Sequence, residues 1–139
     1  MKDDCIFCKL ANGIFETNVV YEDDTFTAIM DVAPAAKGHV IILPKEHVAN
    51  IFELPDEIAS KALIVARKVA AAVKEVTGCD GVNILQNNGE AAGQTVFHYH
   101  IHVIPRFKDD SISITWKQNE VDGEELKNMA TKIVQAINK

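Results

Sequence analysis

The residues best suited to chemistry lie in segment 98–102, where histidine occupies every second position. This segment belongs to an apolar run, residues 96–104, whose alternation and content of β-branched and aromatic residues predict a β-strand. Side chains two residues apart in a strand point to the same face, so His98, His100 and His102 are expected to share one. On a helix, His100 would point away from the other two. Three imidazoles on one face pack poorly in an apolar core, which favours a chemical role.

Two chemical roles fit such a row of histidines. Imidazole has an unperturbed pKa near neutrality and can act as a nucleophile, an acid or base, or a metal ligand. The row could hold a catalytic zinc ion that keeps one position open for water. Alternatively, one histidine attacks the substrate while its neighbours orient it and transfer protons. The histidines alone leave both roles open.

Composition and charge narrow the class of protein. A chain of 139 residues fits one domain, 1–139, and 47% hydrophobic with 24% charged residues is ordinary for a globular protein. A net charge of −6 without a basic stripe argues against a nucleic-acid polymer as a partner, whereas a single nucleotide needs only local donors. We find no signal peptide and no run long enough to cross a membrane. We therefore expect a cytoplasmic protein with no membrane partner.

The hydrophobic pattern predicts an α+β domain with a largely antiparallel sheet, one long central helix and a C-terminal helix. In the final helix, Asp122 and Glu125 have the spacing of a capping box. The expected elements, in chain order, are a hairpin (19–22 and 25–30), a strand (39–43), a helix (55–77), a strand (81–86), a polar loop (87–95) and a helix (122–137). The apolar positions expected to face inward are Ile58, Ala62, Val65, Val69, Ala72, Val73 and Val76 in the long helix and Leu126, Met129, Ile133 and Val134 in the last.

The loop before the histidines carries a second chemical signal. Gly93, Gln94 and Thr95 supply backbone N–H groups, an amide and a hydroxyl, all of which are neutral donors. Such a set can bind phosphate without lysine or arginine, and a glycine lets the backbone approach an anion closely. Beside the histidine row, these three residues indicate a phosphate site next to a nucleophile.

Together these motifs resemble the histidine triad (HIT) family of nucleotide hydrolases and transferases. The alternation of histidine with hydrophobic residues over 98–104 matches the signature of the family. The other matching motifs, in order, are Cys5-Ile6-Phe7-Cys8, Gly38-His39, Pro44-Lys45-Glu46-His47, Asn88-Gly89 and Gly93-Gln94-Thr95. The resemblance covers the chain to about Phe107 and implies a HIT-like fold.

The resemblance assigns a role to each histidine of the row. It makes His100 the nucleophile that attacks the α-phosphorus of a nucleotide and forms a covalent nucleotidyl-histidine intermediate. His102 would bind phosphate and protonate the leaving group, and the backbone carbonyl of His98 would fix the tautomer of His100. The substrate-binding positions implied are Gly93, Gln94, Thr95, Asn88 and His39 near phosphate, Asp31 on the ribose, and Ile29 and Val32 beside a purine base.

Cys5, Cys8, His47 and His98 form a second constellation. A Cys-x-x-Cys pair in a reducing compartment is better interpreted as metal ligands than as a disulfide, and no thioredoxin-like βαβ unit supports a redox role. With two distant histidines, the pair supplies the four ligands of a closed tetrahedral zinc site, as in similar bacterial members of the family. The zinc ion would be structural, and no organic cofactor is implied.

Different motifs of the chain resemble branches of the family that act on different substrates. The N-terminal Cys-x-x-Cys segment is similar to the branch that hydrolyses nucleoside phosphoramidates such as AMP joined to an amine. Residues 92–96 and 104–106 resemble the fragile-histidine branch, which cleaves dinucleoside polyphosphates. A catalytic-metal hydrolase and a nucleotide-binding regulatory module with little turnover are further alternatives. The family also implies a homodimer paired through the long helix and the strand after it.

Overall fold

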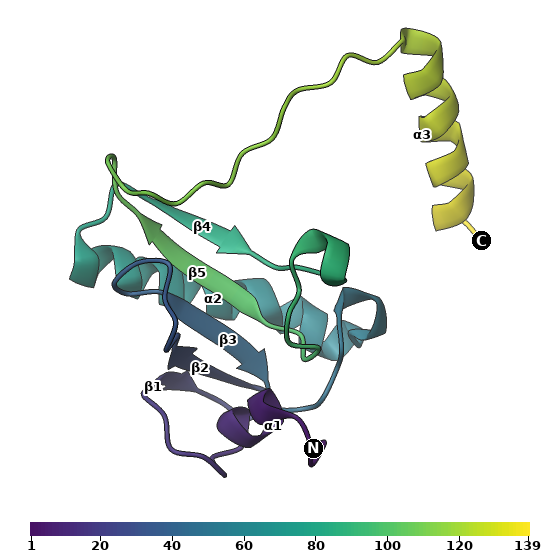
Figure 1. Cartoon of the computed structure of the whole chain (residues 1–139). Coiled ribbons are helices and arrows are strands. Elements are labelled where there is room, and N and C mark those ends of the chain that lie inside the picture. Colours follow the sequence, from purple (N-terminus) through teal and green to yellow (C-terminus); the bar gives the residue numbers. More distant parts are fainter.

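The computed structural model describes residues 1–139 and contains one antiparallel sheet with strand order β1-β2-β3-β5-β4 (Figure 1). Each neighbouring pair of strands is antiparallel, which confirms the predicted α+β class. The pairing places β5, the strand that contains His102, between β3 and β4 and therefore inside the sheet. The strands are β1 (Val19–Glu22), β2 (Phe26–Met30), β3 (Val40–Pro44), β4 (Gly81–Leu85) and β5 (Ile101–Arg106).

Three α-helices and two short 3₁₀ turns complete the chain. The bounds of the long helix agree with the sequence prediction, because Gly78 ends it in the left-handed conformation that favours glycine. No helix is both long and apolar enough to cross a membrane. The helices are α1 (Ile6–Ala11), α2 (Asp56–Thr77) and α3 (Gly123–Ile137), and the 3₁₀ turns are η1 (Ile51–Glu53) and η2 (Glu90–Ala92).

The two faces of the sheet are covered by different helices. One face packs against α2 through a core that includes Phe26, Ile42 and Val103. On the other face, Ala11 of α1 packs with side chains such as Leu43 of β3. Because both faces are covered, β2 and β3 are almost continuously apolar. The predicted stripe of α2 is buried up to Val73, whereas Ala72 and Val76 are exposed.

The predicted strand over residues 96–104 is too long. β5 begins at Ile101, where its pairing with β3 begins. Upstream of that point, the N–H of Tyr99 donates to Val48 O at 2.6 Å, which directs the backbone away from a sheet ladder. Alternation persists nevertheless, because Tyr99, Ile101 and Val103 all enter the core beneath α2. The histidines between them are thereby left on the opposite side.

The expectation that α3 packs inward is also wrong. Leu126, Met129, Ile133 and Val134 are each more than half exposed, and no residue of α3 is buried. Figure 1 shows the reason: an extended segment, residues 113–122, carries α3 away from the sheet. We call this segment the arm. The predicted capping box does not form, since Asp122 makes no side-chain capping bond.

Gly38 precedes β3 at a position that only glycine tolerates. Its φ is +95°, and an added Cβ would lie 2.7 Å from the Cγ2 atom of Thr77 in α2. We expect Gly38→Ala to lower the free energy of unfolding by roughly 2–3 kcal/mol, from backbone strain and this clash. Gly123→Ala is the matched control, because nothing lies near a Cβ there and its φ is unstrained. Urea denaturation of both variants measures the difference, and equal stabilities would contradict this account.

Candidate active site and metal centre

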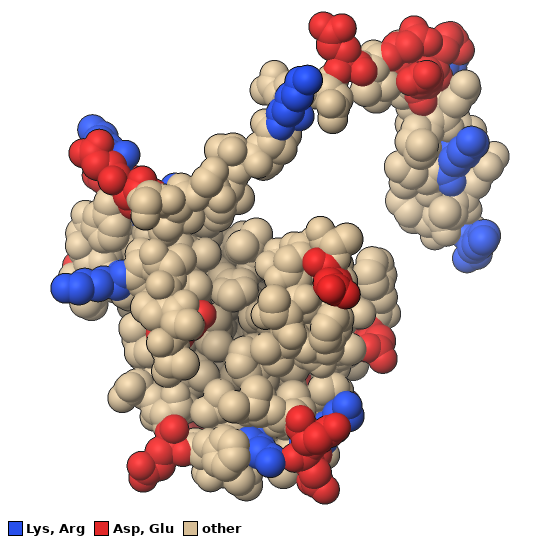
Figure 2. Space-filling view, viewed as in Figure 1, with Lys and Arg blue, Asp and Glu red and all other residues tan.

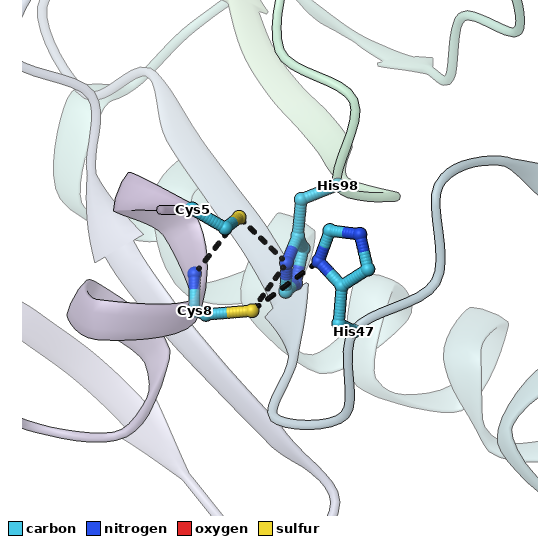
Figure 3. Close-up of side chains that lie close together, drawn as sticks. All are labelled: Cys5, Cys8, His47 and His98. Atoms are coloured by element: carbon cyan, nitrogen blue, oxygen red, sulfur yellow. Dashed lines mark hydrogen bonds between the residues drawn. The ribbon is translucent and has the colours of Figure 1, made fainter. Parts of the chain in front are cut away.

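Four potential metal ligands converge where α1 meets the segment before β5 (Figure 3). Cys5 caps α1 and Cys8 lies in its first turn, while His47 and His98 come from loops after β3 and before β5. The Sγ atom of Cys8 is 3.3 Å from Nδ1 of His47 and 3.4 Å from Nδ1 of His98. The Sγ atom of Cys5 is 3.5 Å from the same His98 nitrogen. The predicted four residues are therefore brought together.

This geometry fits a tetrahedral zinc ion. Zinc–sulfur and zinc–nitrogen bonds of ordinary length would separate sulfur and nitrogen by about 3.5 Å. The ring of His98 is correctly oriented, because its Nε2–H donates to Pro44 O at 2.8 Å and leaves Nδ1 free to face the thiols. Burial raises the pKa of the Cys8 thiol. This means that burial disfavours the thiolate, and a bound cation would offset the effect by stabilising the negative charge on sulfur. The cluster could thus bind a metal ion as a closed site.

Asn12 holds α1 in place next to this cluster. Its side-chain amide donates to Cys8 O at 2.8 Å and to Lys45 O at 2.9 Å, which connects the end of α1 to the chain after β3. The Cys8 N–H also donates to Cys5 Sγ at 3.4 Å, as expected for a helix cap. The cysteines are therefore presented by a short helix that the protein positions through its own hydrogen bonds.

His100 is oriented as a nucleophile. Its Nδ1 lies 2.7 Å from His98 O, and because a carbonyl can only accept, Nδ1 carries the proton. The lone pair is consequently on Nε2. Burial lowers the pKa of His100, so the ring is neutral at neutral pH. The edge contact between this ring and Phe7, with centroids 5.0 Å apart, further restricts its orientation.

A chain of hydrogen bonds sets the tautomer of His102. The backbone N–H of Ala35 donates to Nδ1 of His39 at 3.0 Å, so a neutral His39 carries its proton on Nε2. That Nε2 lies 2.9 Å from Nδ1 of His102, which must accept and therefore has its own proton on Nε2. Burial, followed by the neighbouring His100 and His39, lowers the pKa of His102 to about 4. The carboxylate of Asp31, 3.4 Å from His39 Nε2, opposes this shift.

Gln94 organises the loop that precedes the histidines. Its side chain accepts from the Gly89 N–H at 2.8 Å and donates to Ala49 O at 2.7 Å and Val96 O at 3.1 Å. Both N–H groups of the amide are thus engaged within the protein, and the residue is buried. Gly93, in the left-handed conformation, and Thr95 are exposed at the surface of this loop.

The remaining predicted contact residues have varied environments. The Asn88 side chain is hydrogen-bonded within the protein: it accepts from the Ile51 N–H at 2.8 Å and donates to Gln86 Oε1 at 2.6 Å. Val32 is 88% exposed, whereas Ile29 lies in the core beneath α1.

Sequence reasoning overlooked four groups that position the site. They are the Phe7 ring, the Asn12 amide, the Ala35 N–H and the Pro44 carbonyl. Only Phe7 carried a signal, since it lies between the two cysteines.

A family comparison agrees with this geometry. The model of the HIT domain matches residues 12–109, which is more than half of the chain. The chain belongs to the HIT domain family. Curated relatives include Protein hit of Bacillus subtilis, 39% identical over 97% of this chain and 95% of that protein. Adenosine 5'-monophosphoramidase hnt1 of Schizosaccharomyces pombe is 36% identical over 93% of this chain and 95% of its own length.

Solved structures of similar proteins have the same fold. A protein of Streptococcus mutans superposes with a TM-score of 0.94 at 41% identity, covering 99% of this chain and 87% of that one. A Zn-bound histidine triad family protein from Mycobacterium smegmatis gives a TM-score of 0.75 at 34% identity, covering 96% of this chain and 97% of its own. The α+β HIT fold is therefore shown for this chain.

Metal binding at the four-residue cluster can be tested by removing one ligand. We expect the wild-type protein to retain about one equivalent of Zn²⁺ by elemental analysis, and Cys8→Ser to lose it. A strong chelator should lower the melting temperature of the wild type by roughly 10 °C, because a metal that binds only the folded state stabilises it. Cys79→Ser is the matched control, since Cys79 is also buried but lies outside the cluster. Equal zinc contents in Cys8→Ser and the wild type would exclude this site.

Proposed function

We propose that this HIT protein hydrolyses nucleoside phosphoramidates of the AMP-amine type through a covalent nucleotidyl-histidine intermediate. The observation that carries the proposal is the state of His100: a neutral ring whose Nδ1–H is held by His98 O and whose Nε2 lone pair is free. The monophosphoramidase activity named for the S. pombe relative supports the substrate class.

In the first step, Nε2 of His100 attacks the α-phosphorus and the phosphorus–nitrogen bond to the amine breaks. The departing amine takes a proton from Nε2 of His102, the nitrogen that the hydrogen-bond chain through His39 leaves facing outward. Negative charge on the bound phosphate and on Asp31 favours a protonated His102 at this stage, in which Nδ1 also carries a proton. His39 must then accept that proton through Nε2 and carry its own on Nδ1, which gives up the bond from the Ala35 N–H. Proton transfer returns His102 to its neutral form.

In the second step, water attacks the phosphorus of the nucleotidyl-histidine intermediate. The bond between phosphorus and His100 breaks, which releases a nucleoside monophosphate and restores the neutral imidazole. The deprotonated His102 can accept the proton that the attacking water loses. No redox partner or organic cofactor is needed for either step.

Substrate contacts follow from the surroundings of His100. We propose that Gly93 and Thr95, exposed beside the histidines, contact phosphate oxygens. Gln94 and Asn88 contribute by holding that loop, since their side-chain groups are engaged within the protein. His39 contributes through His102. The ribose is assigned to Asp31 and the base to the exposed side chain of Val32. Ile29, predicted beside the base, is buried beneath α1 and can only support that position from the core.

The cluster of Cys5, Cys8, His47 and His98 is assigned a structural zinc ion. Zinc bound there would fasten α1 to the segment before β5 and supply no Lewis-acid chemistry to the substrate. The alternative in which His98, His100 and His102 together hold a catalytic metal is disfavoured. His98 groups with the cysteines, and His102 groups with Asp31 and His39.

We further propose that the protein is a homodimer paired through α2 and β4. β4 is an edge strand that pairs only with β5. The large side chains of Leu63 and Ile64 on α2 and of Ile84 on β4 are 71%, 48% and 44% exposed. Apolar groups at this edge are suited to a two-fold interface.

The reaction can be tested with an adenosine phosphoramidate and a diadenosine polyphosphate assayed side by side. We expect faster hydrolysis of the phosphoramidate, and a loss of about 10⁴-fold in turnover in His100→Ala because no other nucleophile is present. Melting temperature and zinc content serve as controls for folding of the variant. Faster hydrolysis of the dinucleotide would assign the fragile-histidine type of activity. Tight monophosphate binding without turnover would favour the regulatory module.

The pH dependence of kcat/KM tests the electrostatics of the nucleophile. Because burial lowers the pKa of His100, its neutral form persists below the ordinary histidine value of about 6.5. The acid limb should accordingly lie below that pH. The negative charge of Asp31 raises the pKa of His100, so Asp31→Asn should move the limb to still lower pH. Asp24→Asn, an exposed turn residue, should leave it in place. An acid limb that Asp31→Asn does not move would contradict this account.

A further inference from the structure

The arm leaves the sheet in a fixed direction. The guanidinium of Arg106 donates to both carboxylate oxygens of Asp110, at 2.8 and 2.9 Å, and to Ile112 O at 2.8 Å. A fourth bond, 2.7 Å long, joins it to Asn83 Oδ1 on β4. This charge-assisted pair holds the pKa of Asp110 well below its usual range. Residues 110–112 are thus fastened to the β4 edge before the arm begins.

Beyond this anchor, the chain has apolar surface without a partner in its own domain. The apolar side chains of α3 follow helical spacing on one face, and Ile137 extends that face with 75% exposure. An isolated amphipathic helix of this length gains most of its stability from packing. Figure 2 shows the arm and α3 standing clear of the domain. Some surface must cover this face of α3.

The course of the arm is shared with a solved structure. The arm and α3 make up about a fifth of the chain, so a TM-score of 0.94 with the Streptococcus mutans protein requires them to lie in similar positions. A segment that touches nothing would not keep one course in two proteins that are 41% identical. Contacts outside its own chain would account for this shared course.

The domain has an apolar groove of suitable chemistry. It has a volume of about 290 Å³ and lies between α2 and strands β1–β3. These strands are at the opposite end of the sheet from β4, the edge strand beside which the arm begins. Val76 at its margin is 85% exposed, and Lys68 is the one charged residue in its lining. The first turn of α3 carries Glu124 and Glu125, which complement that lysine.

We propose that α3 of one copy packs its apolar face into this groove on a second copy, and that the exchange is reciprocal. The inference rests on the homodimer proposed above and adds a second contact surface to it. The arm, ten residues long, can span about 33 Å when extended, which is enough to cross a small domain. A two-fold dimer would fill both grooves in this way and leave neither α3 exposed.

Disulfide trapping between differently tagged chains tests the exchange directly. Ile133→Cys is placed on the apolar face of α3 in one chain and Val76→Cys in the other. The mixed sample should yield a cross-linked heterodimer under mild oxidation. Gln135→Cys, on the opposite face of α3, should not cross-link with Val76→Cys. A linked monomer from the double variant Ile133→Cys/Val76→Cys, or no link in any combination, would overturn the proposal.

Light scattering of the full chain separates this inference from the dimer itself. Ile133→Glu and Val76→Glu should each raise the dimer dissociation constant by about tenfold or more, whereas Gln135→Glu should not change it. A dimer that both variants leave intact, without cross-linking, would mean that pairing through α2 and β4 stands and the exchange does not. A monomeric wild type would refute both. Phosphoramidate hydrolysis is measured independently, so loss of the exchange is not confused with failure of the proposed chemistry.

Discussion

The site depends on His98 being held at three points. Its Nε2–H donates to Pro44 O at the end of β3, its Nδ1 faces the two cysteine sulfurs, and its backbone carbonyl accepts from the His100 ring. A rotation of His98 would disturb both the cluster of potential metal ligands and the tautomer of His100. One residue thereby couples the cluster of Cys5, Cys8, His47 and His98 to the His100 ring, which lies outside that cluster.

Burial keeps the histidines of the site unprotonated. Imidazoles removed from water lose much of their affinity for a proton, and the pKa values of His39, His98, His100 and His102 are all lowered mainly for that reason. Every buried side-chain nitrogen and oxygen nevertheless has a hydrogen-bond partner. A neutral ring with a satisfied Nδ1–H retains a single reactive lone pair. The hydrogen bonds thus determine which nitrogen is available, and desolvation keeps it unprotonated.

Sequence reasoning recovered the parts of the fold that depend on local pattern. The bounds of α2 follow from its apolar spacing and Gly78, and the Cys-x-x-Cys pair with His47 and His98 correctly predicted which potential metal ligands converge. It failed where a distant contact decides the outcome. The predicted strand begins too early because alternation of apolar and polar residues does not reveal the hydrogen bond from the Tyr99 N–H to Val48 O. The inward face of α3 was misjudged because periodicity cannot distinguish a core from a surface that another molecule covers.

Although the chain as a whole is acidic, neutral donors close to the histidines can still bind a phosphate group. The whole protein is acidic, with a net charge of −6. On the face shown in Figure 2, charged side chains are scattered at the edges of the domain and its middle is largely free of them. Long-range attraction of an anion is therefore weak, and recognition falls to contacts at short range. Backbone N–H groups around Gly93 and the imidazole N–H of His102 can provide these without the desolvation cost of a buried lysine. Short-range donors of this kind would suffice for the small nucleotide of the proposed reaction, whereas the net charge of the chain opposes binding of a long polyanion.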